Sequence, residues 1–405
     1  VQTCALPIWN FRESILTSLV NRILCRVSLS LITAAAVTTA AAQQSEIGPT
    51  TDAQVQSQNK TKIALIVSPK GSVLSEAAAP IQQGILAASR EATASGACEL
   101  VQYELSNPQD AGAVLKKAAD DGAVLAIGPV SRDAVQTISE MPYLPLPVVA
   151  INRPSGETAP ELFLSIDISA ESEVEQLAKI AVENTAQKAD LAANNFVILT
   201  TQDPYDERLA RAMEAALVKA GAGAERRHIS SDQIAYLRQE MRGKAFRGAF
   251  FAMNAQNASL LRPYLPPELP VFGTSYSNPM HQKDSMLAKT QSNDLNGMIT
   301  LEIPAEENTS TLVAQYKGER ENLSLEELQM FSVGVDAWTL GTKWIDWARR
   351  IEVPDGLTGR LSFDKDSGSK VKRELVKTVV SPNKTGKASE EDLVQFTESA
   401  EEAGL

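Results

Sequence analysis

Histidine and cysteine are scarce in this chain, which has two histidines and three cysteines among 405 residues. Neither His228 nor His281 belongs to an H-x-x-x-H pair, and no two cysteines have the spacing of zinc ligands. The phosphate loop G-x-x-x-x-G-K-[ST] and the nucleophile elbow G-x-S-x-G are also absent. Glu306 and Glu307 are adjacent in a polar stretch, which indicates solvated charge rather than acid–base chemistry. We therefore expect no catalytic residue, no metal site and no cofactor.

Basic residues are also fewer than acidic ones, because the chain has 38 Lys and Arg and 50 Asp and Glu, which gives a net charge of −12. Such a chain repels nucleic-acid phosphates, and it has no Lys/Arg stripe with interleaved aromatic residues. Nucleic-acid binding is therefore not expected, whereas a partner with a basic patch would suit this charge. The composition is 43% hydrophobic and only 5% aromatic, which is ordinary for a globular chain long enough for two domains.

The apolar stretch near the N-terminus is too short to form a stable membrane span. It occupies residues 27–37, follows three arginines and precedes Ala40-x-Ala42, which fits a signal-peptidase site. This order predicts an export signal over residues 1–42 and a mature periplasmic chain that begins near Gln43.

Cleavage at that site would leave Cys98 as the only cysteine, so no internal disulfide is expected. A lipid-bearing cysteine would follow the apolar stretch and a small residue. Cys25 instead precedes that stretch and lies between Leu24 and Arg26, so we find no lipobox. We expect an exported chain without lipid, and association with the outer membrane stays open. Residues 1–8 lack a starting methionine, resemble a translation or assembly scar, and are set aside from the fold.

Apolar runs alternate with helical stretches through most of the chain. The runs at residues 62–68, 124–127 and 147–151 are typical of strands buried on both faces, and the alternation resumes at 196–200 and 248–253. This pattern predicts an α/β fold with mostly parallel sheets flanked by helices, in two lobes.

The two ends of the mature chain lack such a pattern. Residues 43–60 are polar and are predicted to be a linker, and residues 386–405 are predicted to be an acidic tail. The folded domain would then span residues 61–385.

Four short motifs carry a resemblance to a known family. They are Thr274-Ser-Tyr-Ser-Asn278, Asp294-Leu-Asn-Gly297, Gly334-Val-Asp-Ala337 and Gly356-Leu-Thr-Gly359. A short strand and a D-x-D-x-G turn follow the last of them. Together they resemble type I periplasmic-binding-protein folds, and most nearly the penicillin-binding-protein activator family of LppC-type envelope proteins. The resemblance covers roughly residues 62–384.

This resemblance implies a hinged domain in which three crossings join the lobes. A helix predicted over residues 325–349 would return the chain to the first lobe, and the strand at 360–364 would return it to the second. The implied bounds are about 61–166 and 303–350 for lobe 1, and about 167–302 and 351–385 for lobe 2. On the predicted helix, Asp336 interrupts an apolar face and needs a buried hydrogen-bond partner, so we interpret it as structural. The apolar residues of that face are Leu328, Phe331, Val335, Trp338 and Ile345.

Loops at the carboxyl ends of strands are the expected ligand positions in an open α/β sheet. The cleft candidates on these loops are Ser68, Lys70, Ser131, Asn152, Arg153, Asp203, Tyr205, Ser275 and Asp294. Ser131 and Asp203 are equally suited to capping helices, so a purely structural role stays open. No strand-end loop clusters aromatic residues that would enclose a ligand side chain.

The resemblance implies a non-enzymatic regulator of peptidoglycan synthesis that binds a bifunctional penicillin-binding protein and favours its active conformation. The alternative is a periplasmic solute receptor that closes on a small amino-acid-like ligand and feeds a transporter. For the first function, the polar segments 278–294 and 306–325 are expected to be accessible. Tyr316 and Arg320 are the candidate anchors in them.

Overall fold

The computed structural model describes residues 60–384, except 157, 168, 187–194, 231–232, 243, 282–284, 307–311, 321 and 346–348. These described residues all belong to one compact unit, residues 57–405. The predicted export signal, the linker apart from Lys60, and the acidic tail lie outside the described residues, so those predictions stay predictions.

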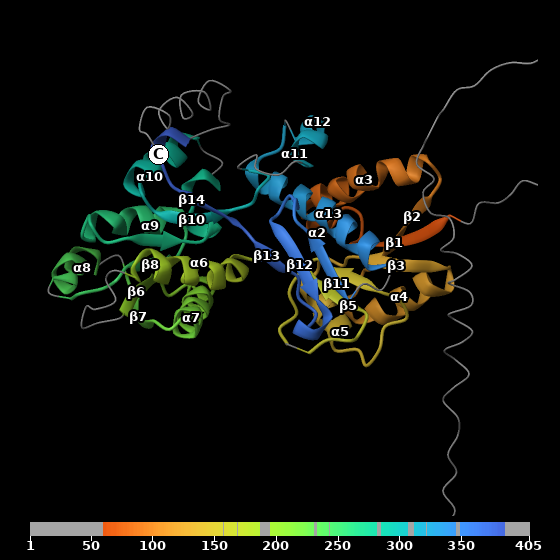
Figure 1. Ribbon diagram of the computed structural model, residues 1–405, viewed down its shortest axis with the longest axis horizontal. Helices are drawn as coiled ribbons and strands as arrows, with labels where there is room; N and C mark the ends of the chain where they lie inside the picture. Colours follow the sequence, from red (N-terminus) through yellow and green to blue (C-terminus); the bar gives the residue numbers. More distant parts are fainter. Residues whose placement is uncertain are drawn as a thin grey trace, which may run out of the picture. The chain divides into compact units, whose positions relative to one another are not determined.

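The first lobe is built on a parallel five-stranded sheet with the order β2-β1-β3-β4-β5 (Figure 1). Its strands are β1 (Thr61–Val67), β2 (Cys98–Glu104), β3 (Ala123–Ile127), β4 (Val148–Ala150) and β5 (Phe163–Ser165). The connecting helices are α2 (Val73–Ala77), α3 (Ala79–Ala94), η1 (Pro108–Asp110), α4 (Ala111–Asp120) and α5 (Arg132–Ser139). Residues 63–66 of β1 are all buried, because apolar side chains on both faces of this strand meet packed neighbours.

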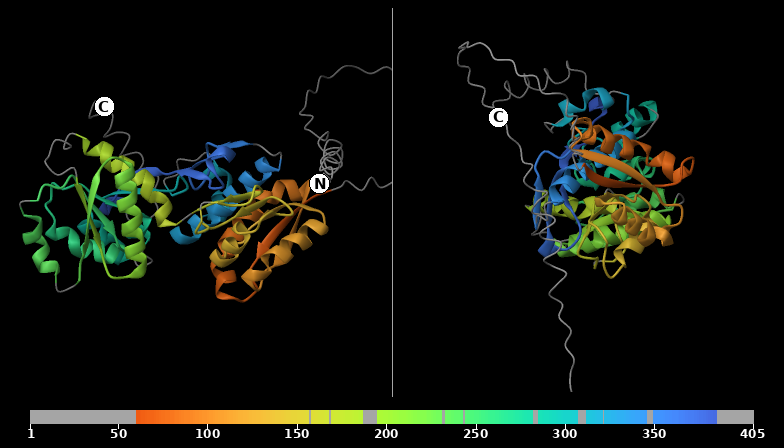
Figure 2. Two further views of the ribbon diagram at one scale, coloured as in Figure 1. Left: turned by 90° about the horizontal axis from the view of Figure 1, so that it is seen from below. Right: turned by 90° about the vertical axis from the view of Figure 1, so that its right-hand side faces the viewer.

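The second lobe contains a six-stranded sheet with the order β14-β10-β9-β8-β6-β7. Its strands are β6 (Asn195–Thr200), β7 (Gly223–His228), β8 (Ala249–Ala252), β9 (Val271–Gly273), β10 (Ile299–Glu302) and β14 (Val376–Val379). All pairs are parallel except β10 with β14. The helical segments are α6 (Ala170–Asn184), α7 (Pro204–Lys219), α8 (Ile234–Met241), α9 (Ala255–Leu261), η3 (Arg262–Tyr264), η4 (Ser275–Ser277), η5 (Pro279–His281), α10 (Ser285–Asp294) and η7 (Pro382–Lys384). Figure 2 shows strands of this lobe between helices.

A third, antiparallel sheet corrects one expectation about the chain path. It has the order β11-β12-β13, with β11 (Arg350–Val353), β12 (Arg360–Asp364) and β13 (Lys372–Glu374), and η6 (Lys365–Ser367) follows β12. We expected the strand at 360–364 to return to the second lobe, and this was wrong. Leu361 and Phe363 share a core cluster with Leu65 and Ile127 of the first sheet. The alternating apolar side chains of β12 pack there, and Phe363 meets the edge of Trp344 with ring centroids 6.2 Å apart.

The helix α13 (Leu325–Trp344) follows two short helices, α11 (Leu312–Gln315) and α12 (Lys317–Arg320). It begins at a capping box, in which Ser324 and Glu327 bond each other's backbone N–H groups. Leu328, Phe331, Val335 and Trp338 of the predicted apolar face are buried and Ile345 is partly buried. The helix ends at Trp344, before the predicted end at residue 349, and β11 begins at Arg350.

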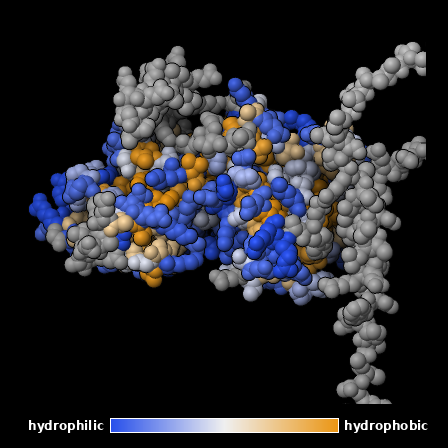
Figure 3. Space-filling view, viewed as in Figure 1, coloured by the Kyte–Doolittle hydropathy of each residue, from blue (hydrophilic) through white to orange (hydrophobic). Residues whose placement is uncertain are grey.

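The surface of the described part is mixed in character. Figure 3 shows hydrophobic residues in groups among hydrophilic ones on the face in view. Among the described residues, no helix combines the length and the apolar character needed to cross a membrane.

Candidate functional site

Several of the predicted cleft residues use their polar groups in hydrogen bonds within the chain. Ser131 caps α5 by accepting the Ala134 N–H at 3.4 Å, and Asp203 caps α7 by accepting the Tyr205 N–H at 2.8 Å. Asn152 donates to the carbonyl of Val130 at 3.1 Å and accepts the N–H of Arg153 at 2.8 Å. These contacts are the structural alternative that the sequence left open, and they leave fewer free groups for a ligand.

The other predicted residues have the following surroundings. Ser68 is partly buried and Lys70 is exposed just after β1. Arg153 lies 3.8 Å from Asp167, measured from Nη1 to Oδ2. Tyr205 packs edge-on against Tyr276, with ring centroids 4.9 Å apart.

Asp294 is exposed at the end of α10. There it lines two adjoining surface hollows of about 540 and about 590 Å³ with Arg238, Pro263 and Tyr264. Arg238 donates to the Pro263 carbonyl at 2.9 Å and lies over the Tyr264 ring.

Ser275 belongs to a buried polar group that the sequence did not reveal. Glu173 of α6 accepts the Ser275 N–H at 2.7 Å and its O–H at 2.5 Å. Burial raises the pKa of Glu173 to about 7, although these hydrogen bonds and the charge of Arg373 act in the opposite direction. Arg373 of β13 also donates to the Ser172 hydroxyl at 3.0 Å, so α6 is tied both to the loop after β9 and to β13.

The hollow beside this group is very small. Glu173, Ser275, Glu302, Gln329, Thr358 and Arg373 are among its lining residues, and its cavity volume is about 10 Å³. A cavity of this size holds about one water molecule. It does not accommodate an amino acid as it stands.

Asp336 of α13 has the buried partners that the sequence required. Its carboxylate accepts the N–H of Leu357 at 3.0 Å, and the N–H and the hydroxyl of Thr358 at 2.8 and 2.6 Å. Burial raises the pKa of Asp336 to about 6 against these three bonds. The helix is thereby fixed to the turn that precedes β12, and the structural role expected for Asp336 is confirmed.

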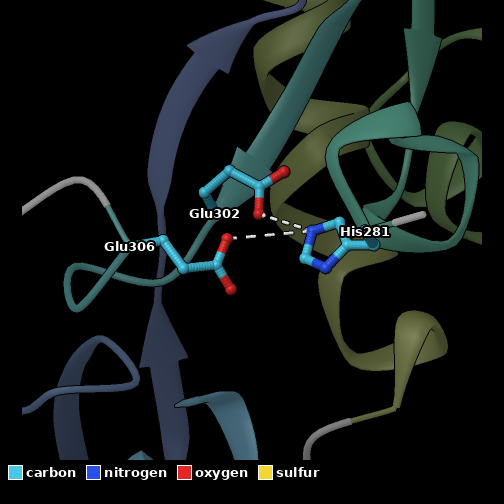
Figure 4. A group of neighbouring side chains, drawn as sticks. All are labelled: His281, Glu302 and Glu306. Atoms are coloured by element: carbon cyan, nitrogen blue, oxygen red, sulfur yellow. Dashed lines mark hydrogen bonds and ion pairs between the residues drawn. The ribbon is translucent and has the colours of Figure 1, made fainter. Parts of the chain in front are cut away.

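A cluster of His281, Glu302 and Glu306 was missed at the sequence level (Figure 4). The ring nitrogen Nε2 of His281 lies 3.0 Å from Oε2 of Glu302 and 3.8 Å from Oε2 of Glu306. The prediction that Glu306 is a solvated charge was wrong, because its side chain is only 7% exposed. No sequence spacing signals this cluster, since its members come from η5, the end of β10 and the turn after it.

The electrostatics of this cluster follow from its burial. Burial disfavours charge on the His281 ring, yet the charge and hydrogen bond of Glu302, together with the charges of Glu306 and Glu173, raise the pKa of His281 to about 9. Burial acts to raise the pKa of Glu302, but the charge of His281 lowers it overall. Burial and the Glu302 charge together raise the pKa of Glu306 well above its usual range.

The candidate partner anchors are less accessible than expected. Tyr316 is only 6% exposed because its ring packs edge-on against Phe331. Arg320 donates to the backbone carbonyls of Val313 and Ala305 at 3.2 and 2.5 Å. Asn278 of the predicted accessible segment is also buried, where it bonds Glu302. Tyr316 and Asn278 are therefore not surface anchors in this structure.

Comparison with solved structures identifies the class of fold as the two-lobed type I periplasmic-binding-protein-like architecture. A "putative branched-chain amino acid ABC transporter" from Chromobacterium violaceum aligns at 23% identity and a TM-score of 0.64, over 79% of this chain and 100% of that one. The C-domain of LpoA from Haemophilus influenzae, "a regulator of PBP1A", aligns at 17% identity and a TM-score of 0.61, over 79% and 98% of the two chains.

Comparison with protein-family models gives a more specific result than comparison of folds. Residues 35–225 match the family described as "LppC putative lipoprotein", which confirms the resemblance stated from the sequence. This match includes the first sheet and strand β6 of the second. Against full-length LpoA from Haemophilus influenzae, the chain aligns at 17% identity and a TM-score of 0.62, over 80% of its own length and 57% of the other chain. No curated protein matches the chain.

Proposed function

We propose that this chain is a non-enzymatic envelope protein that regulates peptidoglycan synthesis by binding a bifunctional penicillin-binding protein. The observation that carries the proposal is the match of residues 35–225 to the LppC family. The likeness to the LpoA C-domain, described as "a regulator of PBP1A", supports it at the level of fold. Binding to the active conformation of the synthase in preference to the inactive one would raise its rate.

The polar contacts of the strand-end loops favour this proposal over a solute receptor. A receptor for an amino acid needs free donors for the carboxylate and a free acceptor for the ammonium group. Here the side chains of Ser131, Asp203 and Ser275 already bond their own chain. The hollow beside Ser275 holds about 10 Å³, which leaves no room for such a ligand.

The deciding experiment measures synthase activity with and without this protein. The purified exported chain is added to the bifunctional synthase of its own organism, and the glycan-polymerising and crosslinking rates are followed separately. We expect one or both rates to rise and then saturate as the chain is added. A solute receptor of the same fold and similar net charge serves as the control and should leave both rates unchanged.

Salt dependence gives a second test of the same complex. The chain carries a net charge of −12, so docking on a basic patch of the synthase should weaken as salt increases. The screening length falls from about 10 Å at 0.1 M to about 3 Å at 1 M ionic strength. Rates that stay flat at saturating chain for every bifunctional synthase of the organism would falsify the activator proposal and leave the solute receptor as the better one.

A further inference from the structure

The group formed by His281, Glu302 and Glu306 has the composition of a metal site. Three ligand atoms, namely His281 Nε2 and one oxygen of each carboxylate, lie within 4.8 Å of one another. Figure 4 shows both carboxylates turned toward the same side of the imidazole ring. The three side chains are 17%, 3% and 7% exposed, so the group is largely removed from bulk water while His281 stays reachable.

The atoms of these side chains that face away from the group are held by other residues. Asn278 and Thr300 bond Oε1 of Glu302, the latter at 3.2 Å. The Gln329 amide nitrogen donates to Oε1 of Glu306 at 3.0 Å and lies 3.5 Å from Nδ1 of His281. Hydrogen bonds to the outer oxygens of both carboxylates are of the kind that orients metal ligands. The Gln329 amide nitrogen can only donate, so it does not play this part for His281, whose Nδ1 would carry the proton when Nε2 binds a metal. Nε2 of His281 and the Oε2 atoms of both carboxylates remain on the inner side of the group.

The spacing of the converging atoms suits a small divalent cation. Ligands bound at 2.0–2.2 Å in a tetrahedron lie about 3.4 Å from one another. The two distances from His281 Nε2, 3.0 Å to Glu302 and 3.8 Å to Glu306, lie on either side of that value. Small side-chain movements would bring both distances from Nε2 to that value.

From this geometry we propose that His281, Glu302 and Glu306 bind a divalent transition-metal ion of the Zn²⁺ class, with water completing its coordination. An imidazole nitrogen favours such an ion over Mg²⁺ or Ca²⁺, which prefer sets of oxygen ligands. The ion would join η5, the end of β10 and the turn after β10, and Gln329 would connect it to α13. Its role is structural, and it does not depend on the proposed synthase partner.

The competing explanation is a simple buried ion pair between His281 and Glu302. Zinc retention by the full exported chain separates the two, provided that the protein carries no histidine tag. The protein is stripped with a chelator, incubated with ZnCl₂, passed through gel filtration and analysed for metal. The proposal predicts about one retained Zn²⁺ per chain and a rise in Tm of roughly 5 °C at saturating Zn²⁺.

The chain has only two histidines, so His228 supplies a matched control. It lies on β7, its side chain is 50% exposed, and it pairs with Glu207. His228→Gln should retain zinc as the wild type does, whereas His281→Gln and Glu306→Gln should each lower the affinity by more than about 100-fold. Gln329→Leu, which removes only an orienting contact, should lower it by about 10–100-fold.

A measurement on the wild-type fold guards against variants that fail to fold. The imidazole signals of the two histidines are recorded by NMR and assigned with His228→Gln, and Zn²⁺ is then titrated into the wild type. The proposal requires the His281 ring signals alone to shift. Zinc that shifts His228, shifts neither ring, or is retained equally by the His281→Gln variant would overturn it and leave the ion pair as the explanation.

Discussion

At the residue scale, buried carboxylates organise much of the polar interior of this protein. Asp336 and Glu173 are both removed from water and both accept backbone N–H and hydroxyl groups from a distant segment. A buried carboxylate without such partners costs several kcal/mol, so each segment is held to its acceptor. These residues thereby specify which loops meet α6 and α13, as well as contributing to stability.

The pH dependence of folding should report on Asp336. Burial raises its folded pKa to about 6 from an ordinary value of 3.8, so the folded state retains a proton that the unfolded chain releases. The stabilisation is present below about pH 4 and is lost as the pH rises through the folded pKa. This loss amounts to about 2 kcal/mol between pH 4 and pH 7.

The variant Asp336→Asn stays neutral and should lack this dependence. Its amide also places an N–H group near the N–H of Thr358, which costs about 1–3 kcal/mol at every pH. In urea unfolding at several pH values, the stability of the wild type minus that of the variant should therefore fall by about 2 kcal/mol from pH 4 to pH 7. A difference that does not change with pH would contradict the assignment of the proton to Asp336.

At the element scale, the first lobe depends on the close approach of α3 and α13. A Cβ atom added to Gly84 would lie 2.0 Å from the carbonyl oxygen of Phe331, and one added to Gly334 would lie 2.0 Å from that of Ile81. Backbone atoms cannot move aside as a side chain can, so only glycine permits this separation. The buried residues of α13 contribute to the large core clusters of both lobes, so this contact supports both.

Alanine at Gly84 should therefore force the two helices apart. We expect Gly84→Ala to lower the free energy of unfolding by about 3 kcal/mol or more. Gly318→Ala is the matched control, since Gly318 is also helical but an added Cβ meets nothing within 4 Å. That variant should be as stable as the wild type or up to about 1 kcal/mol more stable. Denaturant unfolding of both variants checks this, and equal effects at the two positions would rule out the packing argument.

Periodicity in the sequence was enough to predict most of these elements, because buried strands and amphipathic helices are local patterns. The partner of a strand is set by distant residues, and for this reason the predicted path of the chain at residues 360–364 was wrong. The need of Asp336 for a partner could be predicted because it interrupts an apolar face. Glu306 gave no such signal, since His281 is far from it in sequence and Glu302, four residues before it, lies at the end of a strand and not on a shared helix face.

At the scale of the whole molecule, the fold resembles that of a putative branched-chain amino acid ABC transporter protein, and several strand-end groups of this chain contact other residues of the chain. Ser131 and Asp203 cap helices, Ser275 binds Glu173, and Tyr205 packs on Tyr276. A ligand that bound Ser275 through its hydroxyl would have to displace the contact with Glu173. Each buried group left unpaired by such a displacement costs about 1–3 kcal/mol. These contacts support the proposal that the molecule presents a surface to a partner and does not enclose a solute.

This proposal leads to a prediction about small ligands. Amino acids at millimolar concentration, tested singly as a panel, should change the Tm of the exported chain by less than about 1 °C, because weak or absent binding gives almost no linkage stabilisation. Differential scanning fluorimetry measures this directly. The purified synthase, tested in the same way, is the positive comparison and should raise the Tm of the chain in a concentration-dependent manner. A shift of several degrees with one amino acid, and none with the synthase, would favour the solute receptor, since only a ligand that binds the folded chain can stabilise it.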